Sequence, residues 1–176
     1  MYWNRKHVLV CTAQHCMEKG ALNVAGRLRI AMRRSGLDSD VLVNTCDSID
    51  LCDCGPNIIV YPEKVIYSGV QTSDIKDLLT HCEGGEPVER LILSPDSPEE
   101  VARKDFYQEV IDAGWKIPAD DFAAIAEARG FDRTWINEQA RRGFIARKEV
   151  DGTPTINPTT KALSRYRIEF VPPEAE

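Results

Sequence analysis

The first half of the chain alternates between short apolar runs and segments with helical spacing. Apolar residues recur every three or four positions from about Glu18 to Arg34, which predicts a helix that Ser35-Gly36 ends. Apolar runs predict strands at residues 7–10, 41–43, 57–61 and 65–69. The last two strands are close enough to form a hairpin, so the order begins as βαβ followed by ββ.

A further helix closes this half of the chain. It extends from about Thr72 to Cys82, with Thr72 or Ser73 as its N-cap, and His81 lies at its end, where a positive charge interacts favourably with the helix dipole. A βαβ crossover followed by a hairpin and a helix is the thioredoxin arrangement, in which helices cover the faces of a central mixed sheet. The pattern therefore predicts an α/β fold here.

The second half reads as a separate, mainly helical domain. Turn-forming residues at 94–98 mark a boundary, so we expect one domain over residues 1–95 and another over 96–176. Start and stop signals predict helices at about 99–113, 121–129 and 135–142, and Asp151-Gly152 predicts the turn of a β-hairpin. Helix, turn, helix and hairpin resemble a winged helix in outline, an outline that other small packing domains share.

Composition and charge narrow the classes of function. The 176 residues are 43% hydrophobic, no stretch reaches the roughly 20 apolar residues of a membrane span, and the N-terminus does not resemble a secretion signal. We therefore expect a cytoplasmic protein with no membrane contact. The formal net charge of −6 argues against a nucleic-acid partner and suits a carrier that docks on basic patches of other proteins.

Cysteine placement supplies the candidate chemistry. All six cysteines lie in the first half, namely Cys11, Cys16, Cys46, Cys52, Cys54 and Cys82. In a reducing compartment, clustered cysteines more often hold a metal or do redox work than form structural disulfides. Soft anionic sulfur on two converging loops, one after the first strand and one before the hairpin, is what an iron–sulfur cluster requires. The alternative for Cys11 and Cys16 is that they are small core residues.

Four motifs in one order carry a family resemblance. They are VLVCTxxxCxxxGA at residues 8–21, CxxGPNIIVYP at 52–62, VxYxGV at 65–70 and GGEPVERL at 84–91. Over about residues 5–95 the chain resembles the thioredoxin-like [2Fe-2S] ferredoxins, which are related to the small [2Fe-2S] subunit of respiratory complex I. The resemblance implies a one-electron carrier with a [2Fe-2S] cluster near its surface, often as a homodimer.

One expected ligand departs from the family pattern. The family has a second pair, Cys-x3-Cys, before the Gly-Pro, and counting back from Cys52 places Ser48 where the other cysteine should be. We expect the ligands Cys11, Cys16, Cys46 and Cys52. Cys54 and Ser48 stay as alternatives to Cys46. Cys46 is preferred because Gly55-Pro56 constrains the direction of Cys54, and because a hydroxyl binds iron less well than a thiolate.

Two functions from different classes remain. The leading hypothesis is an electron carrier, not an enzyme, that serves a partner redox protein. The alternative is an iron–sulfur redox or oxygen sensor whose C-terminal domain binds a protein or nucleic acid, for example through the basic helix at 133–142. The sequence has no nucleotide-binding glycine motif, no Ser/His/Asp set and no Cys-x-x-Cys at a helix start, which argues against catalysis.

Overall fold

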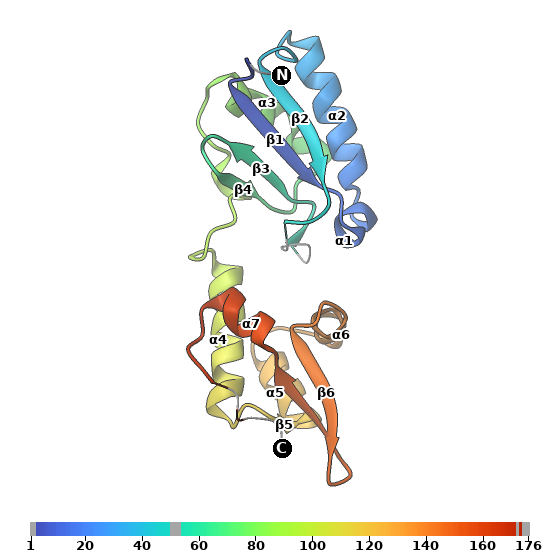
Figure 1. The fold of residues 1–176 in the computed structure, drawn as a ribbon, viewed down its shortest axis with the longest axis vertical. Helices are drawn as coiled ribbons and strands as arrows, with labels where there is room; N and C mark the ends of the chain where they lie inside the picture. Colours follow the sequence, from blue (N-terminus) through green and yellow to red (C-terminus); the bar gives the residue numbers. More distant parts are fainter. Residues whose placement is uncertain (1–2, 50–53, 172, 174–176) are drawn as a thin grey trace. The chain divides into compact units, whose positions relative to one another are not determined.

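The protein consists of two compact units (Figure 1). The structure is a computed structural model that describes residues 3–49, 54–171 and 173. The first unit extends from Met1 to Ser94 and the second from Pro95 to Glu176. Each unit has its own hydrophobic core, so each is described by itself.

The first unit is built on a four-stranded mixed sheet. Its strands are β1 (Lys6–Cys11), β2 (Val41–Cys46), β3 (Ile58–Tyr61) and β4 (Val65–Tyr67). The strand order is β2-β1-β3-β4, with β1 parallel to β2 and the other pairs antiparallel (Figure 1). The predicted mixed sheet and its βαβ, ββα order are confirmed. This topology brings the ends of β1, β2 and β4 and the start of β3 to one edge, which we call the cysteine edge.

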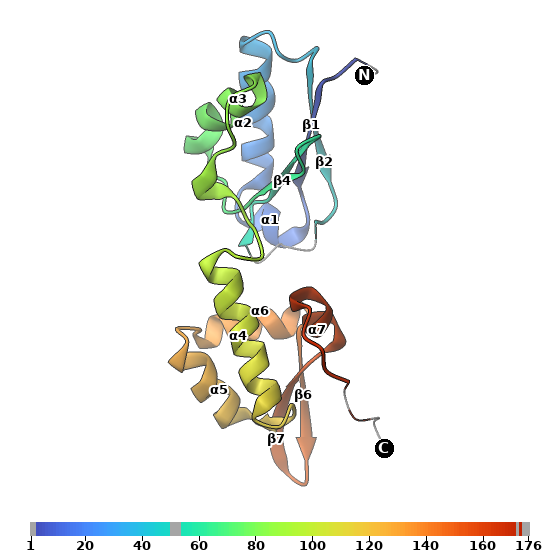
Figure 2. The ribbon, with the colours of Figure 1, turned by 90° about the vertical axis from the view of Figure 1, so that its left-hand side faces the viewer.

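Helices cover one face of this sheet. They are α1 (Gln14–Glu18), α2 (Ala21–Arg34) and α3 (Ile75–Glu83), with a 3-10 turn η2 (Thr72–Asp74) before α3. Figure 2 shows α2 and α3 on the same side of the sheet. The predicted sheet with flanking helices is confirmed, and the structure adds that α2 and α3 flank it on the same face. From Lys6 to Val10, buried residues alternate along β1 as Lys6, Val8 and Val10, as expected for one covered face.

Two helix starts differ from the prediction. The helix predicted from about Glu18 to Arg34 is α2, which begins at Ala21 because its N-cap Gly20 takes a left-handed conformation (φ 92°), and the short α1 before it was not predicted. The N-cap of the turn η2 is Gln71 and the N-cap of α3 is Asp74, so neither is Thr72 or Ser73. The Gln71 backbone N–H donates to the Asp74 carboxylate (2.7 Å), which satisfies a donor at the start of the helical segment.

The other face of the sheet, the open sheet face, is apolar in its middle. Leu9, Leu42, Ile59 and Ile66 are half-buried on it, and Tyr61 is 40% exposed. Leu9 pairs with Ile59, and Ile59 pairs with Ile66, so these side chains form one row across three strands.

The outer edge of β4 is paired with the end of the unit. The Ser68 N–H donates to the Leu91 carbonyl (2.9 Å) and the Leu93 N–H donates to the Ile66 carbonyl (2.8 Å), after a 3-10 turn η3 (Glu89–Leu91). The segment 91–93 therefore occupies backbone groups of β4 that would otherwise face water.

The second unit places helices around a small three-stranded sheet. In chain order it contains α4 (Pro98–Asp112), β5 (Ile117–Pro118), α5 (Ala119–Ala128), α6 (Arg133–Arg141), β6 (Ile145–Val150), β7 (Thr153–Pro158) and α7 (Thr160–Tyr166). The sheet order is β5-β7-β6. The three predicted helices and the hairpin are confirmed, and Asp151 (φ 50°) and Gly152 (φ 77°) form its turn. The sequence reading missed β5 and α7.

Aromatic rings fill the core of the second unit. Phe106 is fully buried and makes edge-to-face contacts with Phe122 (5.2 Å), Phe131 (5.6 Å) and Trp135 (5.2 Å), measured between ring centroids. Phe106 therefore joins α4 to α5 and α6.

In the part of the chain that the structure describes, no helix has the length and hydropathy needed to cross a membrane.

Candidate metal centre

Cys11 and Cys46 are neighbours at the cysteine edge. Cys11 is the last residue of β1, Cys46 is the last residue of β2, and the two are register partners in the parallel pair. Register partners on parallel strands direct their side chains to the same face. Cys11 is fully buried, with its Sγ 3.7 Å from the Asp47 carbonyl oxygen, and Cys46 is half-buried. The sheet therefore places two thiols side by side.

Backbone hydrogen bonds fix the ends of these strands. The N–H and the hydroxyl of Thr12 both donate to the Cys46 carbonyl, at 2.8 and 2.9 Å. The Cys11 N–H donates to the Asn57 carbonyl (2.9 Å), which ties the end of β1 to the start of β3. Cys16 follows on α1 and is fully buried. Ala13, two residues after β1, is the N-cap of this short helix. Cys16 therefore stays near the cysteine edge.

The other candidate ligands lie in the segment between β2 and β3. Ser48 is exposed two residues beyond β2. The Cys54 carbonyl accepts a hydrogen bond from the Gly69 N–H (2.7 Å), just after β4, and Cys54 is half-buried. Gly69 follows β4 and Cys46 ends β2, and these are the two outer strands of the sheet. Cys54 is therefore held next to the outer strand that lies farther from Cys46. Cys52 lies outside the described residues.

The donor chemistry fits an iron–sulfur cluster, although the described thiols are not gathered into a complete site. Within residues 3–49, 54–171 and 173, no three His, Cys, Asp or Glu side chains lie close enough to hold a metal ion. The structure unites Cys11 with Cys46 and keeps Cys16 and Cys54 at the same edge of the fold. Thiols are the ligands that iron–sulfur clusters use.

Cys82 is separate from this group. Its residue lies on α3 and is 1% exposed, and burial raises the pKa of its thiol to about 11. A thiol that stays protonated near neutral pH is a poor metal ligand. The Arg5 side chain donates to the Cys82 carbonyl (2.7 Å), so this residue lies near the start of β1, whereas Cys11 is at its end.

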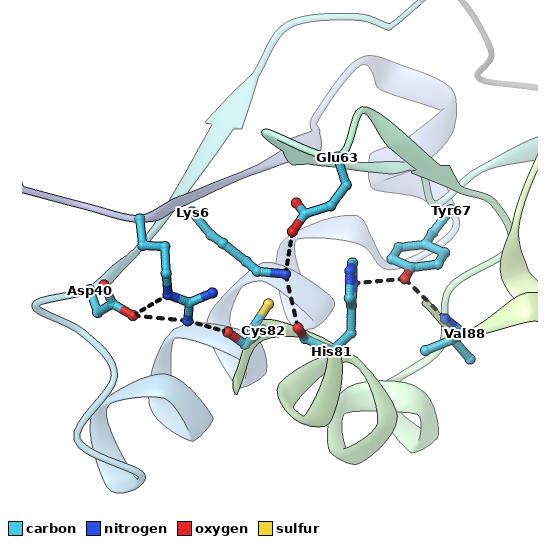
Figure 3. Close-up of polar contacts among 8 residues, drawn as sticks. Lys6, Asp40, Glu63, Tyr67, His81, Cys82 and Val88 are labelled. Atoms are coloured by element: carbon cyan, nitrogen blue, oxygen red, sulfur yellow. Dashed lines mark hydrogen bonds and ion pairs between the residues drawn. The ribbon is translucent and has the colours of Figure 1, made fainter. Parts of the chain in front are cut away.

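A buried polar network surrounds the end of α3 (Figure 3). The Lys6 side chain is 4% exposed, and its Nζ donates to the His81 carbonyl (3.0 Å) and pairs with the Glu63 carboxylate (2.6 Å). Burial raises the pKa of Glu63, but the hydrogen bond from Lys6 opposes this and the pKa is lowered overall. Sequence reasoning missed this network, because lysine is rarely buried and its partners are distant in sequence.

The surroundings of His81 disfavour its charged form. Its side chain is 1% exposed, and its Nδ1 lies 2.8 Å from the Tyr67 hydroxyl, which also accepts the Val88 N–H (3.0 Å). Burial, and then the positive charge of Lys6, lower the pKa of His81 below its ordinary value of 6.5. The expected favourable contact between a charged His81 and the helix dipole is therefore wrong.

Stability should depend on pH through His81. Because the folded-state pKa is lowered, the unfolded chain takes up a proton more readily, and the free energy of unfolding should fall as pH decreases below about 6.5. Chemical denaturation between about pH 7.5 and 5 measures this dependence. His81→Gln should reduce the slope below pH 6.5, whereas His7→Gln should retain it; equal slopes in wild type and His81→Gln would contradict the assignment.

Comparisons with known proteins bear on the first unit. No protein-family model matches the chain. It is 30% identical over 96 residues to "Ferredoxin, 2Fe-2S" of Clostridium pasteurianum, which covers 49% of this chain and 94% of that protein. It is also 30% identical over 106 residues to "Ferredoxin, 2Fe-2S" of Aquifex aeolicus, covering 53% of this chain and 93% of that protein.

The solved structures similar to this chain include the thioredoxin-like [2Fe-2S] ferredoxin from Aquifex aeolicus, with a TM-score of 0.49 and 29% identity over 52% of this chain and 98% of that one. The ferredoxin relatives are electron carriers that hold a [2Fe-2S] cluster. The match to this chain covers 94% and 93% of the two ferredoxin relatives, each at 30% identity. Over about half of its length, the chain belongs to the [2Fe-2S] ferredoxin family.

Proposed function

We propose that the first unit holds a [2Fe-2S] cluster at the cysteine edge and delivers single electrons to a partner redox enzyme in the cytoplasm. The observation that carries the proposal is the register pairing of Cys11 with Cys46, with Cys16 directly after β1. A bound cluster of this kind accepts and releases one electron at a time. The protein is accordingly a carrier and not an enzyme.

The proposed ligands are Cys11, Cys16, Cys46 and Cys52. Cys46 is favoured over Cys54 because it is the β-partner of Cys11, whereas the Cys54 backbone is held at the end of β4 by Gly69. Cys46 is favoured over Ser48 because thiolate binds iron more strongly than a hydroxyl. The hydrogen bonds from Thr12 to the Cys46 carbonyl hold this ligand in position before any metal arrives.

Electron paramagnetic resonance of the anaerobically purified full chain tests the function. We expect a reduced [2Fe-2S] signal, about two irons and two sulfides per chain, and a reversible midpoint potential. A signal that survives air supports a carrier. Cluster loss in air coupled to a change in the affinity for a DNA duplex would instead support the sensor. Absence of iron and sulfide after anaerobic reconstitution would overturn both.

For the second unit we propose a winged-helix-like domain that helps to select the redox partner. The chain order α4-β5-α5-α6-β6-β7 and the sheet order β5-β7-β6 support this proposal, because they place a helical pair beside a three-stranded sheet that ends in a hairpin. Residues 95–176 contain 12 Lys or Arg and 16 Asp or Glu residues, a formal charge of −4, which favours a protein partner over nucleic acid.

We also propose that the first unit forms a homodimer through the open sheet face. Half-buried Leu9, Ile59 and Ile66 form a row there that a second copy would cover, since apolar surface is stabilised by removal from water. Ile59→Lys should convert the dimer to a monomer in sedimentation-equilibrium measurements. Ile30→Lys is the matched control, because Ile30 lies on α2, and it should leave the dimer intact. A monomeric wild type would contradict the proposal.

A further inference from the structure

The outward face of α2 has an unusual composition for a solvent-facing helix. Ile30 is 50% exposed, on the opposite side of the helix from the buried Leu28 and Met32. Arg27 and Arg34 lie on the same outward side, about one turn before and after Ile30. A surface helix usually presents polar residues there, so an exposed isoleucine between arginines is a feature that needs a reason.

This face borders a groove between α2 and α3. The groove has a volume of about 540 Å³, and Ile30, Ile75 and Leu79 line it together with Arg27 and Arg34. Ile75 and Leu79 are one helical turn apart on α3 and are half-buried. The groove therefore combines an apolar strip, formed by Ile30, Ile75 and Leu79, with a polar lining to which Ser35, Thr72 and the guanidinium groups of α2 contribute.

The arginines of this face differ in their contacts from other arginines of the first unit. Elsewhere in the unit, Arg5 pairs with Asp40, and Arg90 pairs with Asp74. Within the described residues, the side chains of Arg27, Arg33 and Arg34 make no ion pair or hydrogen bond. The helix from Ala21 to Arg34 contains no acidic residue, although the whole chain carries a net charge of −6. Positive charge is thus concentrated here and left unneutralised.

We propose that the groove between α2 and α3 binds an acidic amphipathic helix of a partner protein. The apolar strip of the groove accepts the apolar side of such a helix, and arginine pairs with carboxylates through two parallel hydrogen bonds. Arg27 and Arg34 are seven residues apart, about 10 Å along the helix axis, which matches carboxylates two turns apart on an aligned partner helix. A protein helix fits better than a lipid surface, because Ile75 and Leu79 line a groove and do not project.

The test uses the full-length chain and a defined probe. The probe is a fluorescein-labelled synthetic helix of about 18 residues, with leucines at every third or fourth position and flanking glutamates spaced by seven. Fluorescence anisotropy at low salt should show saturable binding that weakens as salt is added. Arg27→Glu with Arg34→Glu should weaken binding by about tenfold, because two attractive contacts become repulsive.

A matched double variant separates this groove from general charge attraction. Lys104→Glu with Lys148→Glu alters two exposed lysines of the second unit, changes the net charge by the same amount, and should alter the affinity by less than about twofold. Arg27→Gln with Arg34→Gln, a milder pair, serves if charge reversal disturbs folding as judged by circular dichroism, and should weaken binding several-fold. The proposal does not rest on the cluster, so apo protein should bind equally well.

Three results would overturn the proposal. The first is no saturable binding of the glutamate peptide by wild-type protein. The second is equal loss of affinity in the groove variant and in the lysine control. The third is binding to phosphatidylserine vesicles that depends on Arg27 and Arg34 when the peptide does not bind, which would assign the surface to a membrane.

Discussion

Replacing Cys46 with serine should remove or strongly alter the reduced [2Fe-2S] signal, whereas replacing Cys54 with serine should leave it unchanged. Cys46 is the register partner of Cys11 at the ends of β2 and β1, and Thr12 fixes its carbonyl group. Cys54 is held instead beside Gly69 after β4. Serine keeps the size of the side chain but exchanges sulfur for an oxygen that binds iron weakly. Electron paramagnetic resonance with iron and sulfide counts measures the difference.

Cys82→Ser is the control for this experiment. Its buried, protonated thiol is not a proposed ligand, so the variant should keep about two irons per chain. Loss of the signal in Cys54→Ser with retention in Cys46→Ser would make Cys54 the ligand. If both variants keep the signal and Ser48→Ala loses it, then the hydroxyl of Ser48 is the ligand.

Phe106→Ala should destabilise the second unit by about 3–5 kcal/mol, because removal of a fully buried ring leaves a cavity that neighbouring rings fill only in part. Phe106 contacts rings from α5, from α6 and from the segment between them, so the loss affects the whole core. Trp115 and Trp135 both belong to the second unit. The third tryptophan, Trp3, belongs to the first unit and is 90% exposed, so the fluorescence change during chemical denaturation should come mainly from the second unit.

Phe170→Ala is the matched control for this aromatic core. Phe170 is half-buried and contacts Trp115 with ring centroids 6.0 Å apart, so its removal should cost clearly less than removal of Phe106. The [2Fe-2S] signal of the first unit should persist in Phe106→Ala, because the two units have separate cores. A loss of less than about 1 kcal/mol would contradict the central role of this ring.

The sequence predicted the main elements because their apolar periods are clear. The missed elements have weak local signals. Helix α1 is only five residues long, β5 contains two residues, and β5 is a strand only because Ile117 pairs with Ile156 of distant β7. Such pairing is a property of the tertiary structure and leaves no period in the local sequence. The open sheet face could not be predicted either, because the order of helices along the chain does not tell which face of the sheet each helix covers.

The candidate metal centre follows from the sequence in residue type and only partly in arrangement. The spacing of Cys11 and Cys16 after a strand indicated ligands, and the parallel pairing of β1 with β2 then placed Cys46 beside Cys11. The buried Lys6 could not be predicted, because its partners Glu63 and His81 come from other elements and a charged side chain is normally assigned to the surface. Arg27, Arg33 and Arg34 of α2 likewise became informative only when the described part of the structure offered them no ion pair.

The pairing of residues 91–93 with β4 defines the smallest part of the chain that should be expressed on its own. A fragment that ends at Arg90 would lack the Leu91 and Leu93 hydrogen bonds and expose the edge of a three-residue strand, and a bare strand edge invites pairing with other molecules. A fragment that ends at Ser94 keeps that edge occupied. The segment 91–93, which lies just before the junction between the units, should therefore also protect the first unit against aggregation.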